Sequence, residues 1–486
     1  MNYSKIILSM EFVIEQTLIK IFNLYKEVFG LDVIDYKYLP ESGSNRVYLR
    51  LYDKEKTIIV SINEDVRENL AFLEINKQLK KSGVRVPEIY YYNVNDGIFL
   101  LQDLGDITLY SRCQENPDRQ KEYYKKVIDD MPLIQIKSAE NFNWDFCYPR
   151  KAFDKQSIMW DLQYFKSYFL RLSGITFDEQ LLEDDFVVFA NYLLETKQDY
   201  FLYRDFQSRN IMLYNDIPYY IDYQGGRKGA LQYDLASLLF EAKANIDEDL
   251  RNELIDYYIQ VFSKYSQFDK KDFQKYFYAY VLIRLLQALG AYGFRGYFQG
   301  KSYFIKSIAP ALKLLEWYIS KIKLEVKIYN LLKYLDAIIN SNFAQNFLKY
   351  SDDNKNLTLH IYSFSYKKGI PFDFTGNGGG FVFDCRFLPN PGKFDEYKKY
   401  TGKDKKVVEF LNNSGISQKF IERVEKIIGD AIIEYKKNDY RDLMICFGCT
   451  GGQHRSVYCA EQLAIKIKEK FNVNIDIIHR ELNKKN

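Results

Sequence analysis

The stretch from Phe201 to Gly226 constrains the fold of this chain more than any other, because it places three polar side chains around one short apolar run. Asp205 comes first, Asn210 follows five residues later, and Asp222 ends the run. A turn interrupts the apolar residues midway, so the sequence predicts a β-hairpin with a polar loop on each side. This spacing suits phosphoryl transfer, which needs one carboxylate near an acceptor hydroxyl and oxygen ligands for Mg²⁺. The alternative is a surface loop with two ordinary aspartates.

The flanking residues favour the first interpretation. The pattern R-D-x-x-x-x-N followed by I-D resembles the catalytic and metal-binding motifs of protein kinases. It is closer to the aminoglycoside phosphotransferase-like enzymes, in which H-G-D-F-x-x-x-N-I and I-D-x-Q/D recur, and Tyr233–Leu238 is also typical of them. Tyr203 stands at the position of the His. The resemblance implies that Asp205 is catalytic, that Asn210 and Asp222 hold Mg²⁺, and that ATP is used.

Length and charge limit the classes of protein to consider. A chain of 486 residues with 47% hydrophobic residues predicts two or three folded domains. Its 68 basic and 65 acidic residues give a net charge of +3, which argues against binding nucleic acid by bulk electrostatics. A local RNA site stays open.

Other features of the sequence indicate a soluble cytoplasmic protein without a membrane partner. The six Cys residues show no metal-binding spacing, so we expect reduced thiols. The first residues contain no signal-peptide core, and no stretch approaches eighteen uncharged apolar residues.

A small lobe is expected ahead of Asp205. An amphipathic helix over 3–29 precedes strands near 33–39, 46–52 and 57–62. The small-residue turn between the first two strands offers backbone N–H groups to nucleotide phosphates. The predicted nucleotide-binding residues are Ser42, Gly43, Ser44, Arg46 and Asp103.

One feature departs from protein kinases. The strand at 57–62 has no Lys, so Glu74 of the following helix has no obvious partner and the α/β-phosphates lack an ammonium group. Bacterial amino-sugar kinases acting on N-acetylmuramate and N-acetylglucosamine look similar in lacking this Lys. Arg46 is a candidate to supply the charge, and a solvated strand-end Arg is the alternative.

Helical patterns dominate from 118 to 320, and a nearly continuous helical stretch at 307–349 is expected to lead out of this domain. Gly300-Lys301-Ser302 ends a segment that invites a P-loop interpretation. We reject it, because the spacing from Gly296 is one residue short and a helix, not a strand, is predicted before it.

A second constellation follows residue 355. An apolar strand, a Gly-containing loop and an amphipathic helix together predict an anion-binding cradle at a helix N-terminus. The predicted phosphate-binding residues are Thr450, Gly451, Gly452, Gln453, His454, Arg455 and Ser456. The loop also reads C-x5-R-S, the cysteine-phosphatase signature, in which Cys449 would be a thiolate nucleophile. In the phosphatase interpretation Asp384 is the nearest acid, but we expect it to pair with Arg386 or a backbone N–H.

Longer matches bear on this choice. Five runs resemble the C-terminal domain of the RapZ family of RNase adaptor proteins: Ser363–Pro371, Phe383–Pro391, Thr401–Asp404, Gly448–Val457 and His479–Leu482. The resemblance implies an α/β domain that binds glucosamine-6-phosphate, with RNA or a kinase-type regulator as further partners in some members, and it does not imply phosphatase chemistry. RapZ proteins carry a P-loop NTPase domain in front, whereas this chain carries a kinase-like one.

The sequence therefore predicts a bilobal α+β protein-kinase-like domain at 1–325, a connecting helix and linker at 326–354, and a smaller α/β phosphate-binding domain at 355–486. The resemblance implies an ATP- and Mg²⁺-dependent phosphotransferase acting on a sugar or amino-sugar hydroxyl, with a second domain binding an amino-sugar phosphate. The alternative is a pseudokinase adaptor that binds nucleotide together with RNA or protein, since Tyr203 and the missing Lys are compatible with it.

Overall fold

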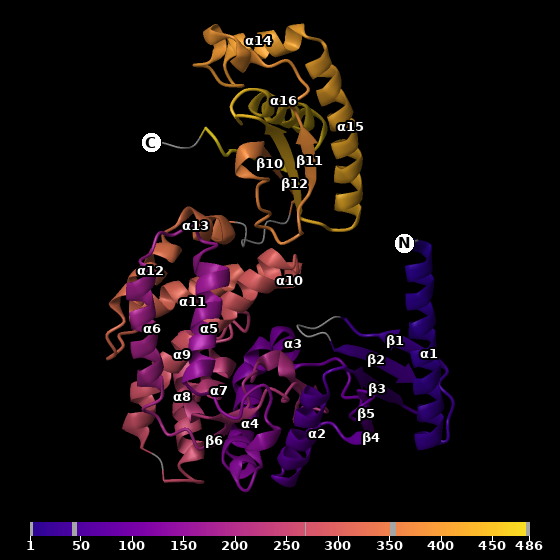
Figure 1. The fold of residues 1–486 in the computed structure, drawn as a ribbon, viewed down its shortest axis with the longest axis vertical. Helices are drawn as coiled ribbons and strands as arrows, with labels where there is room; N and C mark the ends of the chain where they lie inside the picture. Colours follow the sequence, from indigo (N-terminus) through magenta and orange to yellow (C-terminus); the bar gives the residue numbers. More distant parts are fainter. Residues whose placement is uncertain (1–2, 41–45, 268, 350–355, 483–486) are drawn as a thin grey trace. The chain divides into compact units, whose positions relative to one another are not determined.

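The computed structural model describes residues 3–40, 46–267, 269–349 and 356–482. The chain forms two compact units (Figure 1). The first contains residues 1–164, 177–288 and 317–334, and the second contains residues 165–176, 289–316 and 335–486. The fold class is the expected one, a bilobal α+β kinase-like domain followed by a smaller α/β domain.

The small lobe of the first unit is a five-stranded antiparallel sheet in the order β1-β2-β3-β5-β4. Its strands are β1 (Asp35–Tyr38), β2 (Val47–Tyr52), β3 (Thr57–Ile62), β4 (Ile89–Asn93) and β5 (Ile98–Gln102). Helix α1 (Tyr3–Phe29) packs Ile21 and Tyr25 against Leu49 and Val60 of the sheet. The predicted first helix and the three predicted strands are confirmed within a few residues.

Helix α2 (Val66–Lys81) connects β3 to β4. It begins after Asp65, whose side chain accepts hydrogen bonds from the backbone N–H groups of Arg67 and Glu68 and caps the first turn. Its buried face carries Phe72, whose ring meets that of Phe99 edge-on at 5.2 Å between centroids. The helix is thereby fixed in rotation relative to the sheet.

Helices follow from residue 109. Their bounds are α3 (Leu109–Glu115), α4 (Gln120–Gln135), α5 (Lys155–Phe165), α6 (Glu179–Leu193), α7 (Leu231–Leu239), α8 (Glu248–Phe262), α9 (Lys270–Tyr292), α10 (Ser302–Ile305), α11 (Ile308–Lys321), α12 (Tyr329–Ile339) and α13 (Asn342–Lys349). The nearly continuous helical stretch expected at 307–349 consists of three helices, α11, α12 and α13, which residues 322–328 and 340–341 separate.

The segment that follows α9 settles the P-loop question. Gly293–Phe298 continues α9 as a π-helix, and Gly300-Lys301-Ser302 leads into α10. A P-loop needs a strand ahead of it, so the rejection is confirmed. In the described part of the chain, Lys270–Phe298 is long and apolar enough to span a membrane, but 67% of its most apolar window is buried inside the fold, as in a core helix.

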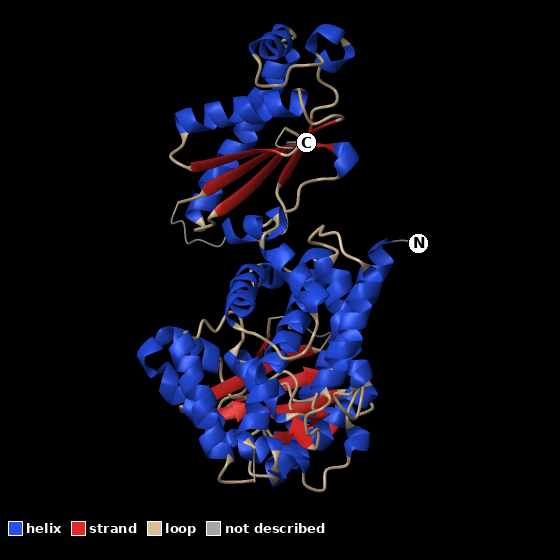
Figure 2. Ribbon diagram, turned by 90° about the vertical axis from the view of Figure 1, so that its left-hand side faces the viewer, coloured by secondary structure: helices blue, strands red, loops and turns tan. Residues whose placement is uncertain are grey.

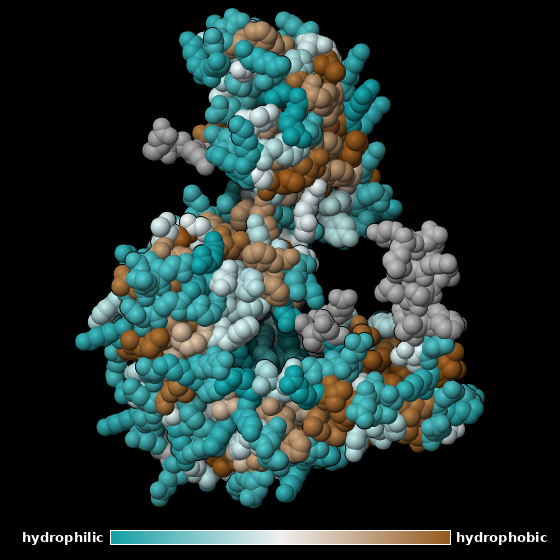
Figure 3. Space-filling view, viewed as in Figure 1, coloured by the Kyte–Doolittle hydropathy of each residue, from teal (hydrophilic) through white to brown (hydrophobic). Residues whose placement is uncertain are grey.

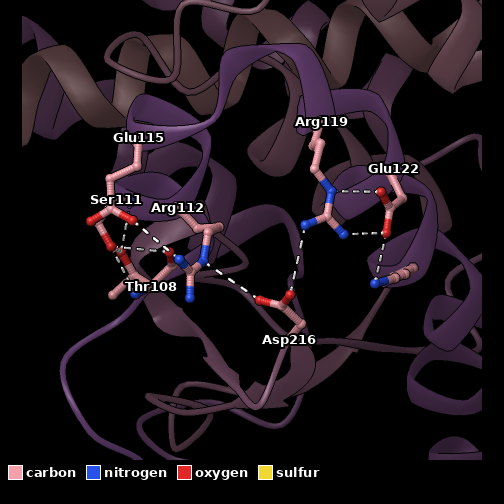
Figure 4. Close-up of polar contacts among 8 residues, drawn as sticks. Thr108, Ser111, Arg112, Glu115, Arg119, Glu122 and Asp216 are labelled. Atoms are coloured by element: carbon pink, nitrogen blue, oxygen red, sulfur yellow. Dashed lines mark hydrogen bonds and ion pairs between the residues drawn. The ribbon is translucent and has the colours of Figure 1, made fainter.

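The predicted hairpin is present between the helices. Strands β7 (Ile211–Tyr214) and β8 (Ile217–Tyr220) pair antiparallel around Asn215 and Asp216, both of which have positive φ. Asp216 lies between Arg112 and Arg119, 3.5 and 3.8 Å from their nearest nitrogens (Figure 4). These ion pairs attach the tip of the hairpin to α3 and to the residue that precedes α4.

The α/β domain in the second unit is built on a parallel sheet in the order β11-β12-β10-β13. Its elements are β10 (Thr358–Ser365), β11 (Phe381–Asp384), α14 (Lys405–Asn413), α15 (Ile416–Lys437), β12 (Asp442–Cys449), α16 (Arg455–Lys470) and β13 (Asn474–His479). All four strands end at the same edge, so their carboxyl-terminal residues are brought together there.

Residues of α15 and α16 pack on one face of that sheet. Figure 2 shows the sheet in red among the blue helices of this domain. The core on this face is apolar, with Ile361, Ile445 and Leu463 fully buried. Brown side chains in Figure 3 gather along the α15 side of this domain, where Ile427 and Ile433 of α15 are exposed. Helix α15 therefore presents apolar side chains outward as well as inward.

Candidate functional site

The loop that carries Asp205 is held from behind by Asp234 of α7. Strand β6 (Tyr200–Leu202) ends just before it and pairs with β9 (Arg227–Gly229). The backbone N–H of Tyr203 donates to Asp234 Oδ2 at 2.7 Å, and that of Arg204 donates to Oδ1 at 3.1 Å. Burial raises the pKa of Asp234 to about 7, against the effect of these two hydrogen bonds. Asp234 thus fixes the backbone at the start of the loop.

Arg204 turns the chain toward Asp205 and is itself anchored. Its φ of 82° is unusual for a residue other than glycine. Its guanidinium group donates to Asp161 Oδ1 at 2.8 Å and to the Tyr233 hydroxyl at 2.6 Å. The Arg of the R-D pair is therefore a buried anchor that holds the strained turn in place.

Asn210 links the backbone of Asp205 to the carboxylate of Asp222. Its Nδ2 donates to the backbone oxygen of Asp205 at 2.8 Å and to Asp222 Oδ2 at 3.1 Å. Tyr203, which replaces the family's His, donates from its hydroxyl to the Ile221 carbonyl oxygen at 2.6 Å. The structure therefore brings Asp205, Asn210 and Asp222 into one site, as the spacing predicted.

Asp222 has left-handed backbone geometry, with φ of 67°. Gln224 Nε2 donates to its Oδ1 at 2.9 Å, so each carboxylate oxygen accepts one side-chain amide. The pKa of Asp222 is raised, mainly because surrounding protein atoms reduce the hydration of its carboxylate, and further by the negative charge of Asp205. The positive charge of Arg46 opposes this rise. A cation at this point would relieve the repulsion between the two carboxylates.

The donor atoms at this point fit Mg²⁺, which prefers oxygen ligands and takes only one or two carboxylates when phosphates supply the rest. Gln224 Oε1 is buried and has no hydrogen-bond partner among the described residues. Within those residues no cluster of three or more His, Cys, Asp or Glu is arranged to hold a metal ion. Asp222 and Asn210 would be the protein ligands of a nucleotide-bound Mg²⁺.

Asp205 faces a cation. Nη2 of Arg284 in α9 lies 3.7 Å from Asp205 Oδ1, and the Asp205 side chain keeps 41% of its surface exposed. Gly225 lies on the other side, since a Cβ added there would be 3.9 Å from Asp205 Oδ2. The carboxylate of Asp205, the predicted catalytic residue, is therefore accessible from solvent.

The predicted phosphate loop, Ser42 to Ser44, lies outside the described residues. Arg46, which follows it, is buried, and its Nη2 is 3.0 Å from Glu68 Oε1 of α2. Its guanidinium group also lies 5.2 Å from the centre of the Phe72 ring. Strand β3 has no Lys that could pair with an acidic residue of α2. Arg46, directly before β2, forms such an ion pair instead.

Glu74 was expected to lack a partner in β3, which has no Lys. Its carboxylate pairs instead with Lys77, one turn later on the same helix, at 2.7 Å. Glu68, nearer the start of α2, is the acidic residue of this helix that pairs with Arg46. The sequence did not single out Glu68, because the rotation of α2 was unknown.

Asp103 has a structural role in the connection between the lobes. Its carboxylate lies 2.7 Å from Arg50 Nε, accepts the Gly105 N–H at 2.9 Å, and is only 5% exposed. Arg50 also contacts Asp106 at 2.9 Å. Since both partners already occupy the Asp103 carboxylate, any nucleotide contact here would come from backbone groups.

The predicted anion cradle lies at the carboxyl edge of the parallel sheet, between β12 and α16. Cys449 is buried, and its Sγ lies 3.2 Å from Gly452 N and 3.2 Å from Ser456 Oγ. Thr450 accepts a hydrogen bond on its carbonyl oxygen from Ser365 at 2.6 Å. The Cys449 sulfur is thus enclosed by its own loop, in keeping with a small packed residue.

Arg455 and His454 are turned toward neighbouring segments. Arg455 Nη1 donates to the carbonyl oxygens of Arg386 and Leu388 at 2.6 and 3.2 Å, and the residue is 5% exposed. His454 Nε2 lies 3.2 Å from the Tyr397 carbonyl oxygen. Arg455 therefore ties the loop to the segment after β11, while Thr450, Gly451 and Gln453 are exposed.

Asp384 pairs as expected. Its carboxylate accepts two hydrogen bonds from the Arg386 side chain and one from the Arg386 backbone N–H at 2.8 Å. These contacts lower the pKa of Asp384, which keeps it ionised. An ionised carboxylate cannot protonate a leaving group, which argues against phosphatase chemistry.

Four residues of the kinase-like site were missed. Asp234 lay in a motif already noted as typical of the family, and Gln224 lay two residues after Asp222. Arg284 had a signal of its own, because it is the only charged residue from Tyr276 to Tyr292. Glu68 had none that distinguished it from Glu74.

Comparisons with known proteins match the N-terminal and C-terminal parts of the chain to two different families. Residues 35–269 match the family model of the phosphotransferase enzyme family, and residues 357–483 match that of the RapZ C-terminal domain. Both predicted family resemblances are thereby confirmed.

Individual relatives are similar over one part each. A nucleotide-binding protein of Clostridium botulinum is 44% identical over 128 residues, which are 26% of this chain and 41% of that protein. One from Shewanella is 43% identical over 131 residues, 27% of this chain and 44% of that protein. The chain thus spans about two fifths of the length of these curated relatives. The solved choline kinase LicA from Streptococcus pneumoniae is 15% identical, with 64% of this chain and 100% of that chain covered and a TM-score of 0.43.

Proposed function

We propose that this chain, which joins a domain of the phosphotransferase enzyme family (residues 35–269) to a RapZ C-terminal domain (residues 357–483), transfers the γ-phosphate of ATP to a hydroxyl group of a sugar or amino sugar. The observation that carries the proposal is the convergence of Asp205, Asn210 and Asp222, with Asn210 bonded to both aspartates at 2.8 and 3.1 Å. These are the side chains that phosphoryl transfer needs.

In the proposed reaction the acceptor hydroxyl binds at Asp205 and gives its proton to that carboxylate. The hydroxyl oxygen forms a bond to the γ-phosphorus, while the bond from that phosphorus to the bridging oxygen of the β-phosphate breaks and ADP leaves. Asn210 and Asp222 would hold Mg²⁺, which supplies charge neutralisation for the phosphates. The protein itself mainly orients the reacting groups.

Arg46 is proposed to bind the nucleotide phosphates. Glu68 and the Phe72 ring hold its guanidinium group at the start of β2, directly after the predicted phosphate loop. Its charge also reaches Asp222, where it opposes the rise in pKa that burial and Asp205 cause. The pair of Arg46 and Glu68 would serve where protein kinases use a Lys and a Glu.

The C-terminal domain supports an amino-sugar acceptor. By resemblance to the RapZ family it would bind glucosamine-6-phosphate at the loop from Thr450 to Ser456, and a domain that recognises a phosphorylated amino sugar fits beside a kinase acting on one. We propose glucosamine-6-phosphate as the ligand of this domain. We also propose that the protein is cytoplasmic and has no membrane partner.

Turnover of ATP measured against a panel of sugars, amino sugars and aminoglycosides tests the proposal. We expect one class of acceptor to stimulate ADP release, and we expect Asp205→Asn to lower kcat by roughly 10²–10⁴-fold, the usual contribution of a general base. Asp216→Asn, an equal change at the hairpin tip, should leave kcat unchanged because the Asp216 carboxylate pairs with Arg112 and Arg119.

A wild-type protein that binds Mg-ATP but phosphorylates no member of the panel would contradict the enzyme assignment. That result would support the alternative, an adaptor that binds nucleotide together with RNA or protein. Binding of Mg-ATP should therefore be measured by calorimetry on the same preparation.

A further inference from the structure

Arg284 is a charged residue in an apolar helix. The seventeen residues from Tyr276 to Tyr292 contain no other charge, and Arg284 is 8% exposed. Burying a guanidinium group is unfavourable unless its donors find partners. The neighbours of the three guanidinium nitrogens explain why an Arg is buried at this position of α9.

Two of the nitrogens are fixed by neutral side chains. Nε donates to Ser237 Oγ of α7 at 2.9 Å, and Nη1 donates to Gln287 Oε1 one turn later on α9. Nη2 is 3.7 Å from Asp205 Oδ1, which is an ion-pair distance but too long for a hydrogen bond. Among the described residues Nη2 has no hydrogen-bond partner, so its donors remain available beside the catalytic carboxylate.

Other nearby arginines are engaged elsewhere. Arg204 is bound to Asp161 and Tyr233. Arg209 stacks on the Tyr110 ring at 4.6 Å, and buried Arg227 donates from Nε to the Gly225 carbonyl oxygen. The charges of Arg204 and Arg227 also act on Asp205. Among the described residues Arg284 is the cation within ion-pair distance of the Asp205 carboxylate.

We propose that Arg284 is a catalytic residue whose Nη2 donates to an oxygen of the γ-phosphoryl group during its transfer. The inference rests on the proposed function. The acceptor hydroxyl must meet both Asp205 and the γ-phosphorus, so a cation beside Asp205 also lies beside the phosphoryl oxygens. Charge in the transition state is spread over those oxygens, and a donor that is already in place stabilises it without reorganisation.

Helix α7 positions both partners. Asp234 of α7 binds the backbone at the start of the Asp205 loop, and Ser237, one turn later on the same helix, binds Arg284. The carboxylate and the guanidinium group are therefore set against one rigid element. This shared support makes their separation a property of the fold.

The test compares Arg284→Gln and Arg284→Lys with Arg251→Gln in the full-length chain. Arg251 is an equally buried Arg of the same unit, stacked on the Trp317 and Phe240 rings away from Asp205. We expect Arg284→Gln to lower kcat by roughly 10²–10³-fold, the loss seen when one preorganised donor is removed. KM for Mg-ATP and acceptor should change little, Arg284→Lys should recover part of kcat, and Arg251→Gln should affect only the melting temperature.

Several results would overturn the role of Arg284 while leaving the proposed function intact. One is an unchanged kcat in Arg284→Gln, and another is a raised acceptor KM at constant kcat, which would place Arg284 on the acceptor. A melting temperature lowered as in Arg251→Gln, with full kcat for the folded protein, would make its role structural.

An inactive wild type would count against the proposed function, and the inference would then be tested by binding. Calorimetric titration of the full chain with Mg-ADP and aluminium fluoride, a mimic of the phosphoryl group, should show at least about tenfold weaker binding in Arg284→Gln, a difference of about 1.4 kcal/mol. Mg-ADP alone should bind both proteins equally. Equal affinity of both proteins for the fluoride complex would refute the role of Arg284.

Discussion

Both carboxylate oxygens of Asp222 accept a side-chain amide, from Gln224 at 2.9 Å and from Asn210 at 3.1 Å. An isolated carboxylate would be free to rotate, whereas this one is held toward Asp205. The two amides use their nitrogens on Asp222, which leaves amide oxygens to share a cation with it. Under the proposed function, that cation would be the Mg²⁺ that comes with the nucleotide.

This organisation predicts the effect of Asp222→Ala on nucleotide binding. Loss of an outer-shell partner typically weakens metal affinity about 10- to 100-fold, and loss of a direct ligand should cost at least about as much. We expect Mg-dependent ATP affinity to fall by that range, while ATP binding without Mg²⁺ changes little. Calorimetric titration with and without Mg²⁺ measures both, and Asp216→Ala is the matched control on the same hairpin.

At this scale the sequence predicted some residues and missed others for a physical reason. Asp205, Asn210 and Asp222 flank one hairpin, so their spacing along the chain nearly determines their spacing in space. Glu68 and Arg284 reach the site from separate helices. Their identification depends on how α2 and α9 are rotated against their neighbours, which spacing alone does not determine.

Helix α7 determines the geometry of the catalytic loop at the scale of elements. Its Asp234 accepts the N–H groups of Tyr203 and Arg204, and its Tyr233 accepts from the Arg204 side chain. Tyr203 then reaches the Ile221 carbonyl oxygen beside Asp222. A Tyr in place of the expected His therefore still links the Asp205 loop to the segment that carries Asp222, so the substitution by itself does not indicate a pseudokinase.

Asp234 should make stability depend on pH. Burial raises its pKa to about 7, so the folded protein keeps this proton at pH values where the unfolded chain has released it. Between about pH 4 and pH 7 the unfolded state binds fewer protons, and the unfolding free energy must fall as pH rises, by up to about 1.4 kcal/mol per pH unit. The Asp234→Asn variant has no group that titrates at this position, so it lacks this contribution.

Urea unfolding of wild type and Asp234→Asn at pH 5, 6, 7 and 8 measures the effect. The unfolding free energy of the wild type relative to the variant should decrease from pH 5 to pH 7 and then stay constant. A relative stability that does not vary with pH would show that Asp234 is already ionised at pH 5.

The two domains differ in how far the sequence specified them. The RapZ-like domain was recognisable from near-continuous motifs, and its sheet brings those motifs together at one edge because parallel strands end there. The connecting helices were less predictable. Residues 307–349 are largely apolar at helical spacing, and the break at 322–328 carries no Gly, Pro or capping signal. At Asn340-Ser341 the Ser341 hydroxyl accepts the Ala344 N–H at 3.2 Å and caps α13, a signal too short to be distinguished from a continuing helix.

Ligand binding at the loop between β12 and α16 can be tested in the whole chain with glycine variants, which leave every charged side chain in place. Gly452 has φ of 71°, and a Cβ there would lie 2.4 Å from Glu481 Cγ and 2.9 Å from Ser365 N, so Gly452→Ala must distort the loop. A Cβ at Gly451 meets nothing within 4 Å, so Gly451→Ala should preserve it. Arg455→Ala is less informative, because Arg455 also holds the carbonyl oxygens of Arg386 and Leu388.

If the loop binds an amino-sugar phosphate through its backbone N–H groups, glucosamine-6-phosphate should bind wild type and Gly451→Ala alike and bind Gly452→Ala at least about tenfold more weakly, a loss of about 1.4 kcal/mol. Titration in the Asp205→Asn background prevents turnover from obscuring the heat of binding. Cys449→Ser should also retain the ligand, since its sulfur is buried and contacts Gly452 and Ser456 of the loop itself. Phosphate-ester hydrolysis by wild type that disappears in Cys449→Ser would instead establish a phosphatase, and equal affinity of the two glycine variants would place the ligand elsewhere.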